Sequence, residues 1–167
     1  IAHMLIGMMF ALILNTRYLG TKTKGIFRVV YALPWMFTAS VIAILWRMML
    51  DPNGVINYFI QVLGISDESV TFLASRDIAL YSVTLINIWS GYPFYMISIL
   101  AGLQGISPDL YEASSLDGAN TVQSFFGITI PQLKPILISL IMLDFVWTLQ
   151  QFALIWMTTG GGPVNAT

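Results

Sequence analysis

Cysteine is absent from this sequence, and histidine occurs once, as His3. These shortages exclude a disulfide framework, thiol catalysis and metal sites built from cysteine and histidine clusters. Charge is also scarce: 9% of the 167 residues are charged, whereas a soluble domain has about 25%. The formal net charge of −1 leaves no basic surface of the kind that binds nucleic acid, so we expect no nucleic-acid partner.

Apolar residues, by contrast, make up 57% of the chain, and the mean hydropathy is +0.79. A chain of this length could not bury so much apolar surface in one water-soluble core. We therefore expect a lipid bilayer as its surroundings and an all-α fold, a polytopic bundle of membrane helices, because the apolar runs are too long and too unalternating for barrel strands. The sequence starts inside an apolar run and stops after a glycine cluster, so we expect residues 1–167 to be part of one transmembrane domain that lacks flanking helices at both ends.

Four apolar runs reach or approach the roughly 17–25 residues that a membrane crossing needs. They cover residues 1–15, 27–50, 78–103 and 135–157. Four crossings place the loops 16–26 and 104–134 on one side of the membrane and the loop 51–77 on the other. The first side carries Arg17, Lys22, Lys24, Arg28 and Lys134, and the second carries Arg47 and Arg76. The positive-inside rule then predicts that the first side is cytoplasmic.

One cytoplasmic stretch, Tyr111–Pro131, reads YEASSLDGANTVQSFFGITIP and differs from the apolar runs around it. Upstream of it, Ser107 is a good N-cap and Pro108 suits the first helical position. Gly118 supplies a left-handed residue that can close the helix, which predicts a short helix over 108–117.

A second short helix, capped by Asn120, is expected to end near Phe126, after which Pro131 and Pro135 restart the chain into the fourth apolar run. Two short helices hinged at Gly118 would form a compact projection. Its mixed apolar and acidic surface fits either an interfacial loop on lipid headgroups or a protein partner. The excess of acidic over basic side chains favours the protein partner.

This stretch resembles the EAA loop of permease subunits of binding-protein-dependent ABC importers. That pattern has Glu-Ala-Ala, then three residues, Gly, nine residues and Ile-x-Leu-Pro. Here stand Glu112-Ala113-Ser114, then Gly118, then Ile128-Thr129-Ile130-Pro131, with Ser114 and Ile130 as the two departures. The upstream LAGLQGISPDLYEA, the run LPWMFTASVIAILWRMMLDPNGVINYF and the closing TTGGGPVNAT are similar to the sugar-permease branch, that of the maltose and glycerol-phosphate systems.

The resemblance implies a partner set and a mechanism. Residues 107–131, the coupling loop, would dock on a cytoplasmic ATPase dimer, and ATP-driven closure of that dimer would rock the membrane helices. A sister permease, more often a different chain than a second copy, and an extracytoplasmic solute-binding protein would complete the importer. ATP and magnesium would be used by the partner ATPase, and no cofactor would be bound by this chain. The residues that would couple to the ATPase are Glu112, Ala113, Ser114, Asp117, Gly118, Ala119, Ile128 and Pro131.

The fourth apolar run contains Asp144, a carboxylate that must face the bundle interior or water. In a continuous helix, Trp147, Thr148 and Gln151 would share its face. An aromatic side chain beside carboxylate and amide groups suits a sugar, so this stripe is a candidate substrate path. The alternative is that Asp144 bonds a neighbouring helix and Trp147 packs.

In the third run a stripe of small and polar residues favours helix packing, and Asn87 is the member that we expect to face the path. The glycine run before Pro163 lacks the lysine of a phosphate-binding P-loop. His3 is expected to be a packed or interfacial residue.

We therefore predict the permease subunit of an ATP-driven importer of a sugar or oligosaccharide, in the inner or plasma membrane of a bacterium or archaeon. It is not itself an enzyme, and no catalytic or metal-binding residue is assigned. Glycerol phosphate, a polyol or another small solute is the alternative cargo. From other classes, a membrane enzyme lacks a convergent catalytic set, and a passive channel or scaffold would not need a coupling loop.

Overall fold

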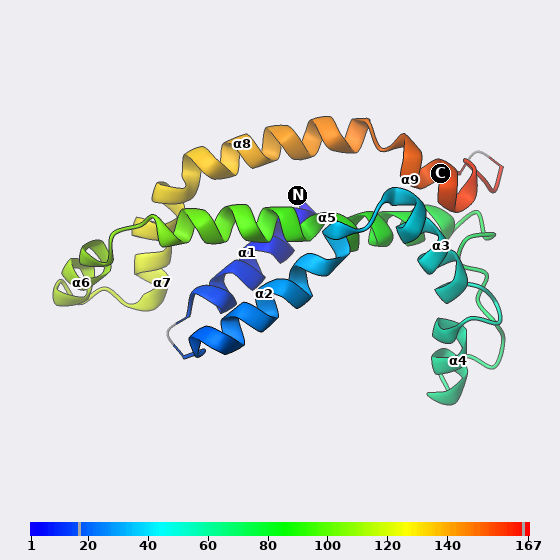
Figure 1. Ribbon diagram of the computed structural model, residues 1–167, viewed down its shortest axis with the longest axis horizontal. Helices are drawn as coiled ribbons and strands as arrows, with labels where there is room; N and C mark the ends of the chain where they lie inside the picture. The colour runs from blue at the N-terminus through cyan, green and yellow to red at the C-terminus, as the bar shows by residue number, and fades with distance from the viewer. Residues whose placement is uncertain (17, 165) are drawn as a thin grey trace. The chain divides into compact units, whose positions relative to one another are not determined.

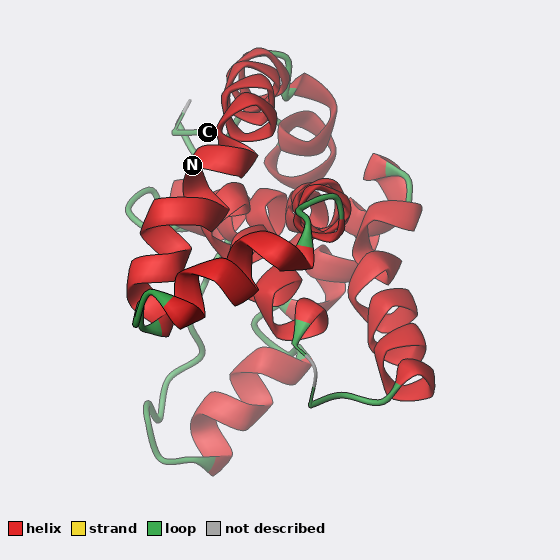
Figure 2. Cartoon of the chain, turned by 90° about the vertical axis from the view of Figure 1, so that its left-hand side faces the viewer, coloured by secondary structure: helices red, strands yellow, loops and turns green. Residues whose placement is uncertain are grey.

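The computed structural model describes residues 1–16, 18–164, 166 and 167. Every regular element in this part of the chain is a helix, as Figures 1 and 2 show, which confirms the predicted all-α class. The elements are α1 (Ala2–Asn15), α2 (Thr21–Met36), α3 (Ala39–Met49), α4 (Val55–Val62), α5 (Ala79–Gln104), α6 (Pro108–Leu116), α7 (Thr121–Ser124), the π-helical turn η1 (Phe125–Thr129), α8 (Ile130–Leu149) and α9 (Phe152–Thr159).

The chain forms two compact units, each built from two segments of sequence. The first unit comprises Ile1–Leu33 and Gly91–Leu149, and the second comprises Pro34–Ser90 and Gln150–Thr167. The unit boundary falls inside α5, so the N-terminal part of this helix belongs to the second unit and its C-terminal part to the first.

The core of the first unit lies where α1 and α8 pack against the C-terminal part of α5 (Figure 1). Its buried members are Ala11, Leu14, Tyr95, Met96, Ile99, Leu100, Leu103, Leu133 and Leu140. Glycine permits close contact on both sides of α5. A Cβ on Gly7 would lie 2.8 Å from the Met96 backbone nitrogen, and a Cβ on Gly102 would lie 2.7 Å from Leu133 Cδ2.

The core of the second unit is formed by α3, α9 and the N-terminal part of α5, around Trp46, Ile86 and Leu154. The rings of Trp46 and Trp89 meet edge to face, with centroids 5.4 Å apart. The long connection after α4 is held by Asn57, which is 1% exposed. Its amide nitrogen donates to the Val70 carbonyl (2.9 Å), and its amide oxygen accepts from the Val70 N–H (2.8 Å).

Two helical stretches are long and apolar enough to cross a membrane: Ala79–Gln104 and the continuous stretch Thr121–Leu149. A third crossing is present if α2 and α3 together form one broken span, and α1 is a shorter apolar helix. The predicted third run is therefore confirmed. The predicted second run is divided, because the helix stops at Met36 and Thr38 caps α3 by accepting a hydrogen bond from the Val41 N–H.

The fourth run differs from the prediction at both ends. The helix begins earlier, at Thr121, and passes through Pro131 and Pro135, so the expected end near Phe126 is wrong. It also stops earlier, at Leu149, where Gln150 and Gln151 form a turn before α9. The turn is closed by the Phe152 N–H, which donates to the Gln150 carbonyl (2.8 Å).

Candidate functional site

The first helix of the coupling loop, α6, forms where its local signals predict. The Ser107 side chain accepts a hydrogen bond from the Asp109 N–H, and Pro108 occupies the first turn. At the other end Gly118 adopts φ +81°, and its N–H donates to the Ser115 carbonyl (3.1 Å). The next N–H, of Ala119, donates to the Ser114 carbonyl (2.9 Å), which completes a Schellman cap. Both ends of the helix are therefore fixed by hydrogen bonds between residues that are close together in the sequence.

The second helix of the coupling loop begins in a capping box. The Asn120 side chain accepts from the Gln123 N–H (2.9 Å), and the Gln123 side chain accepts from the Asn120 N–H (2.8 Å). After one turn the pattern widens to a π-helix, in which the Ile130 N–H donates to the Phe125 carbonyl. Pro131 has no N–H to offer, so the regular ladder is interrupted beside this wide turn.

The coupling loop presents two different faces. Leu116 is 89% exposed, and Glu112, Ala113, Asp117 and Gly118 are exposed as well. A side chain added at Gly118 would meet nothing within 4 Å. An exposed leucine beside two carboxylates and small residues is a surface that a protein partner can cover.

The remaining predicted coupling residues are placed differently. Ser114 is partly buried, donates to the Tyr111 carbonyl (3.1 Å) and shares a hydrogen bond with Ser124 (3.0 Å). Ala119 and Ile128 are partly buried too, whereas Pro131 is exposed on the first turn of α8. Ser114 thus makes its contacts inside the coupling loop.

The mid-span carboxylate of Asp144 is buried, with 7% of the residue exposed. Tyr95 Oη donates to Asp144 Oδ1 (2.8 Å), and His3 Nδ1 lies 2.8 Å from the same oxygen. The imidazole of His3 also stacks on the ring of Tyr95, with centroids 5.3 Å apart. Three helices of the first unit therefore meet at one carboxylate.

His3 and Tyr95 were missed as site residues by the sequence analysis. The available signal was the carboxylate itself, because a charge inside a membrane helix requires donors. Which side chains supply them depends on how α1, α5 and α8 pack, and no local pattern reports that packing.

The predicted stripe on the fourth run is only partly formed. Trp147 is 42% exposed and lies against Phe94, with ring centroids 5.0 Å apart. Thr148 is exposed on the next position of α8. Gln151 does not continue the stripe, because α8 ends at Leu149 and Gln151 stands at the N-cap position of α9, in the second unit. Asn87 lies on the part of α5 that belongs to the second unit, and its side chain is partly buried.

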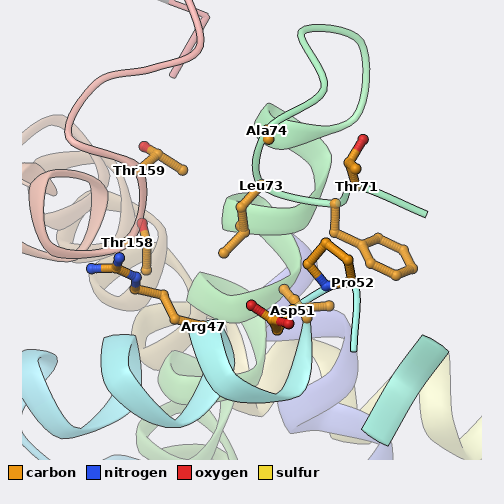
Figure 3. A pocket seen from close by; sticks show the side chains of 10 residues that line it. Arg47, Asp51, Pro52, Thr71, Leu73, Ala74, Thr158 and Thr159 are labelled. Carbon is orange, nitrogen blue, oxygen red and sulfur yellow. The ribbon is translucent and has the colours of Figure 1, made fainter. Parts of the chain in front are cut away.

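The second unit contains a cavity of about 270 Å³ between the end of α3, the segment 71–74 and the end of α9 (Figure 3). Figure 3 shows the Arg47 side chain extending toward Thr158 along one wall. The cavity is lined by none of the residues assigned above to coupling or to the substrate path. Within the described residues, no group of three or more acidic, histidine or cysteine side chains is placed to hold a metal ion.

Comparison with known proteins gives the family. Residues 4–167 match the family described as binding-protein-dependent transport system inner membrane component. The chain is 37% identical over 164 residues to the trehalose/maltose transport system permease protein MalF of Thermococcus litoralis, covering 98% of this chain and 54% of that protein. It is 34% identical over 160 residues to the maltose/maltodextrin transport system permease protein MalF of Salmonella typhimurium, covering 95% of this chain and 30% of that protein.

The fold is similar to that of a chain in a bacterial alginate ABC transporter, solved in complex with an alginate pentasaccharide-bound periplasmic protein. The TM-score is 0.74 at 22% identity, over 95% of this chain and 56% of that one. The chain spans about half the length of the first curated relative above and less than a third of the second. The recognition made from the EAA pattern is confirmed, and the chain belongs to the family of binding-protein-dependent transport system inner membrane components.

Proposed function

We propose that this chain is the membrane-spanning part of an ATP-driven importer that translocates a sugar or oligosaccharide. The observation that carries the proposal is the coupling loop. It is a capped, exposed pair of helical turns at the base of the long helix Thr121–Leu149, with a surface suited to a protein partner. A passive channel or scaffold has no need of such a surface.

The partners follow from the same proposal. A cytoplasmic ATPase dimer binds the coupling loop and consumes ATP and magnesium, while this chain binds no cofactor. A sister permease completes the membrane pore, and a solute-binding protein delivers the cargo from outside. The complex resides in the inner or plasma membrane of a bacterial or archaeal cell. The alginate transporter with its periplasmic protein supports a binding protein as partner.

Sugar is favoured as cargo by the relatives and by the charge of the long helices. Two of the curated relatives, those of Thermococcus litoralis and Salmonella typhimurium, are maltose or trehalose permeases by name. Helix α5 holds no charged residue, and the only charges of α8 are Lys134 near its start and Asp144. A phosphate ester such as glycerol phosphate would need a cation near mid-span, so a neutral sugar fits better than the alternative cargo.

Within the path, we assign different roles to the residues of the predicted stripe. The Asp144 carboxylate is engaged by donors from α1 and α5, which supports the reading that it joins helices. Trp147 and Thr148, both exposed on α8, remain the candidates for sugar contact, with Asn87 on α5. Gln151 is the weakest candidate because it follows the helix break.

The decisive test replaces Gly118 by aspartate in the full-length permease, assembled with its partner subunits in liposomes. Gly64 offers a matched control. Both glycines follow a short helix and have positive φ (+81° for Gly118 and +67° for Gly64). A Cβ added to either one would meet no atom within 4 Å. Gly118→Asp and Gly64→Asp therefore impose similar backbone strain of about 1–2 kcal/mol.

We expect Gly118→Asp to abolish the ATPase activity stimulated by the binding protein, while the variant remains folded in the membrane with its sister subunit. Gly64→Asp should keep the stimulation. If Gly118→Asp retained full stimulation and co-purified with the ATPase as the unchanged protein does, the coupling loop would not be the ATPase contact and the proposal would fall.

A further inference from the structure

Two side-chain hydrogen bonds tie α6 to the helix that follows it. Tyr111 Oη and Thr129 Oγ1 lie 2.9 Å apart, and Ser114 Oγ and Ser124 Oγ lie 3.0 Å apart. The Ser114 hydroxyl already donates its one proton to the Tyr111 carbonyl. Ser124 is therefore the donor in the pair with Ser114, and both hydroxyls are used.

The π-turn explains how the second helix can meet α6 at both points. Tyr111 and Ser114 are three residues apart and share one face of α6. Ser124 and Thr129 are five residues apart, and in a regular α-helix such residues point about 140° away from each other. The wider i→i+5 turn η1, which covers Phe125–Thr129, brings the fifth residue back toward the same side.

The contact at Thr129 is anchored in the spanning helix. Thr129 is 4% exposed, and it lies within the helical stretch that extends to Leu149. Tyr111 is partly buried, whereas its neighbours Glu112 and Ala113 are exposed. The face of α6 that bonds to the spanning helix is thus separate from the face offered to a partner.

We infer that Tyr111, Ser114, Ser124 and Thr129 form a brace that transmits movement of α6 to α8. This inference rests on the proposed function, in which an ATPase displaces α6. Without the brace, the hydrogen bonds that remain at the junction of α6 and α7 in the described residues are those of the Gly118 turn, and a push on α6 would be absorbed by rotation about that turn. With the brace, the same push moves the base of α8.

The experiment measures sugar molecules transported per ATP hydrolysed by the full importer in liposomes with its binding protein. Tyr111→Phe and Thr129→Val each remove one hydroxyl at nearly constant shape, and Ser114→Ala removes the second bond. The matched controls are Tyr58→Phe, at an exposed tyrosine of α4, and Ser139→Ala, at an exposed serine of α8 whose hydroxyl donates to the Pro135 carbonyl of its own helix.

We expect Tyr111→Phe and Thr129→Val each to lower the transport-to-ATP ratio by about three- to tenfold. That is the change in an equilibrium constant that the net loss of one hydrogen bond typically causes. The double variant should be no worse than the more affected single variant, because both singles remove the same bond. The two controls should keep the unchanged ratio.

A covalent replacement separates transmission from general stability. Residues 1–167 contain no cysteine. In a full importer whose other cysteines, where present, have been replaced, Ser114→Cys and Ser124→Cys can therefore be joined specifically, by oxidation or by a short thiol crosslinker. In the Tyr111→Phe background, joining the two thiols should restore the transport-to-ATP ratio, and reduction or omission of the linker should lower it again.

Two failures have different meanings. If the unchanged complex shows no stimulation by its binding protein, the proposed function is wrong. If the unchanged complex is coupled, but Tyr111→Phe and Thr129→Val keep its ratio, or joining the thiols brings no recovery, the brace is overturned while the proposed function stands.

Discussion

At the scale of single residues, the buried carboxylate of Asp144 shows how a membrane helix accommodates a charge. Its Oδ1 atom is contacted by both Tyr95 from α5 and His3 from α1, so the desolvated group keeps hydrogen-bond partners. Interhelical hydrogen bonds of this kind stabilise membrane proteins by about 0.6 kcal/mol on average and up to about 1.7 kcal/mol. Asp144 with its two partners is therefore a contribution to helix packing in the first unit.

Replacing Tyr95 by phenylalanine should accordingly lower the free energy of unfolding by about 0.6–1.7 kcal/mol, because the aromatic ring remains and only the donor to Asp144 is lost. The measurement is thermal unfolding of the purified permease in detergent. Tyr81→Phe is the control, since Tyr81 lies on the same helix and is 74% exposed. Equal unfolding temperatures for the two variants would show that the Tyr95–Asp144 bond contributes nothing to stability.

At the scale of elements, the contact between α1 and α5 depends on the absence of a side chain at Gly7. A Cβ there would lie 2.8 Å from both the Met96 backbone nitrogen and Tyr95 Cβ. Backbone atoms of a packed helix cannot move aside as a flexible side chain can, so the helices would have to separate. Overpacking of this kind costs about 1–3 kcal/mol.

Gly7→Ala should therefore destabilise the protein by that amount, even though alanine is the better helix former. Gly25→Ala in α2 is the matched control, because an added Cβ there meets nothing within 4 Å. It should leave stability unchanged or raise it by about 0.5–1 kcal/mol. The measurement is the thermal unfolding temperature of both purified variants in detergent. A temperature for Gly7→Ala at or above that of Gly25→Ala would contradict the close packing of α1 on α5.

Elements whose signals are local were predictable from the sequence, and those that depend on packing were not. Ser107, Gly118 and Asn120 cap helices through hydrogen bonds to residues a few positions away, and each acts as its residue type predicts. The π-turn was not predicted, because it depends on where Thr129 must point to meet Tyr111. The turn at Gln150 and Gln151 also escaped prediction, since the hydrophobic pattern continues on both sides of it.

The candidate site divides in the same way. The residues predicted to couple could be picked out because their spacing lies within one short stretch, and two of them, Glu112 and Gly118, are exposed. Ser114 was assigned to the same surface, but its hydroxyl makes its hydrogen bonds inside the loop, with the Tyr111 carbonyl and Ser124 Oγ. The EAA pattern marks which residues of the loop match the family, but it does not show whether each side chain faces a partner or the loop itself.

At the scale of the whole molecule, the distribution of lysine and arginine predicts which end of the long helices lies in the cytoplasm. Helix α5 has 26 residues and is apolar enough to cross the membrane on its own. The segment 51–77 precedes it in the chain and the coupling loop follows it. A crossing by α5 would therefore place these two segments on opposite sides of the membrane, whichever way α1, α2 and α3 are counted.

Single cysteines at Ser66 and Ser115 test this orientation, in a full-length background whose other cysteines, where present, have been replaced. Residues 1–167 contribute no cysteine of their own, so in this region a thiol reagent reports only the introduced position. Ser66 lies before α5, and Ser115 is exposed on α6 after it. A membrane-impermeant maleimide should label Ser66→Cys in intact cells and Ser115→Cys only after the cytoplasmic face is opened. Labelling of both positions from one side would mean that α5 does not cross the membrane, and the reverse pattern would place the coupling loop outside, where no ATPase could reach it.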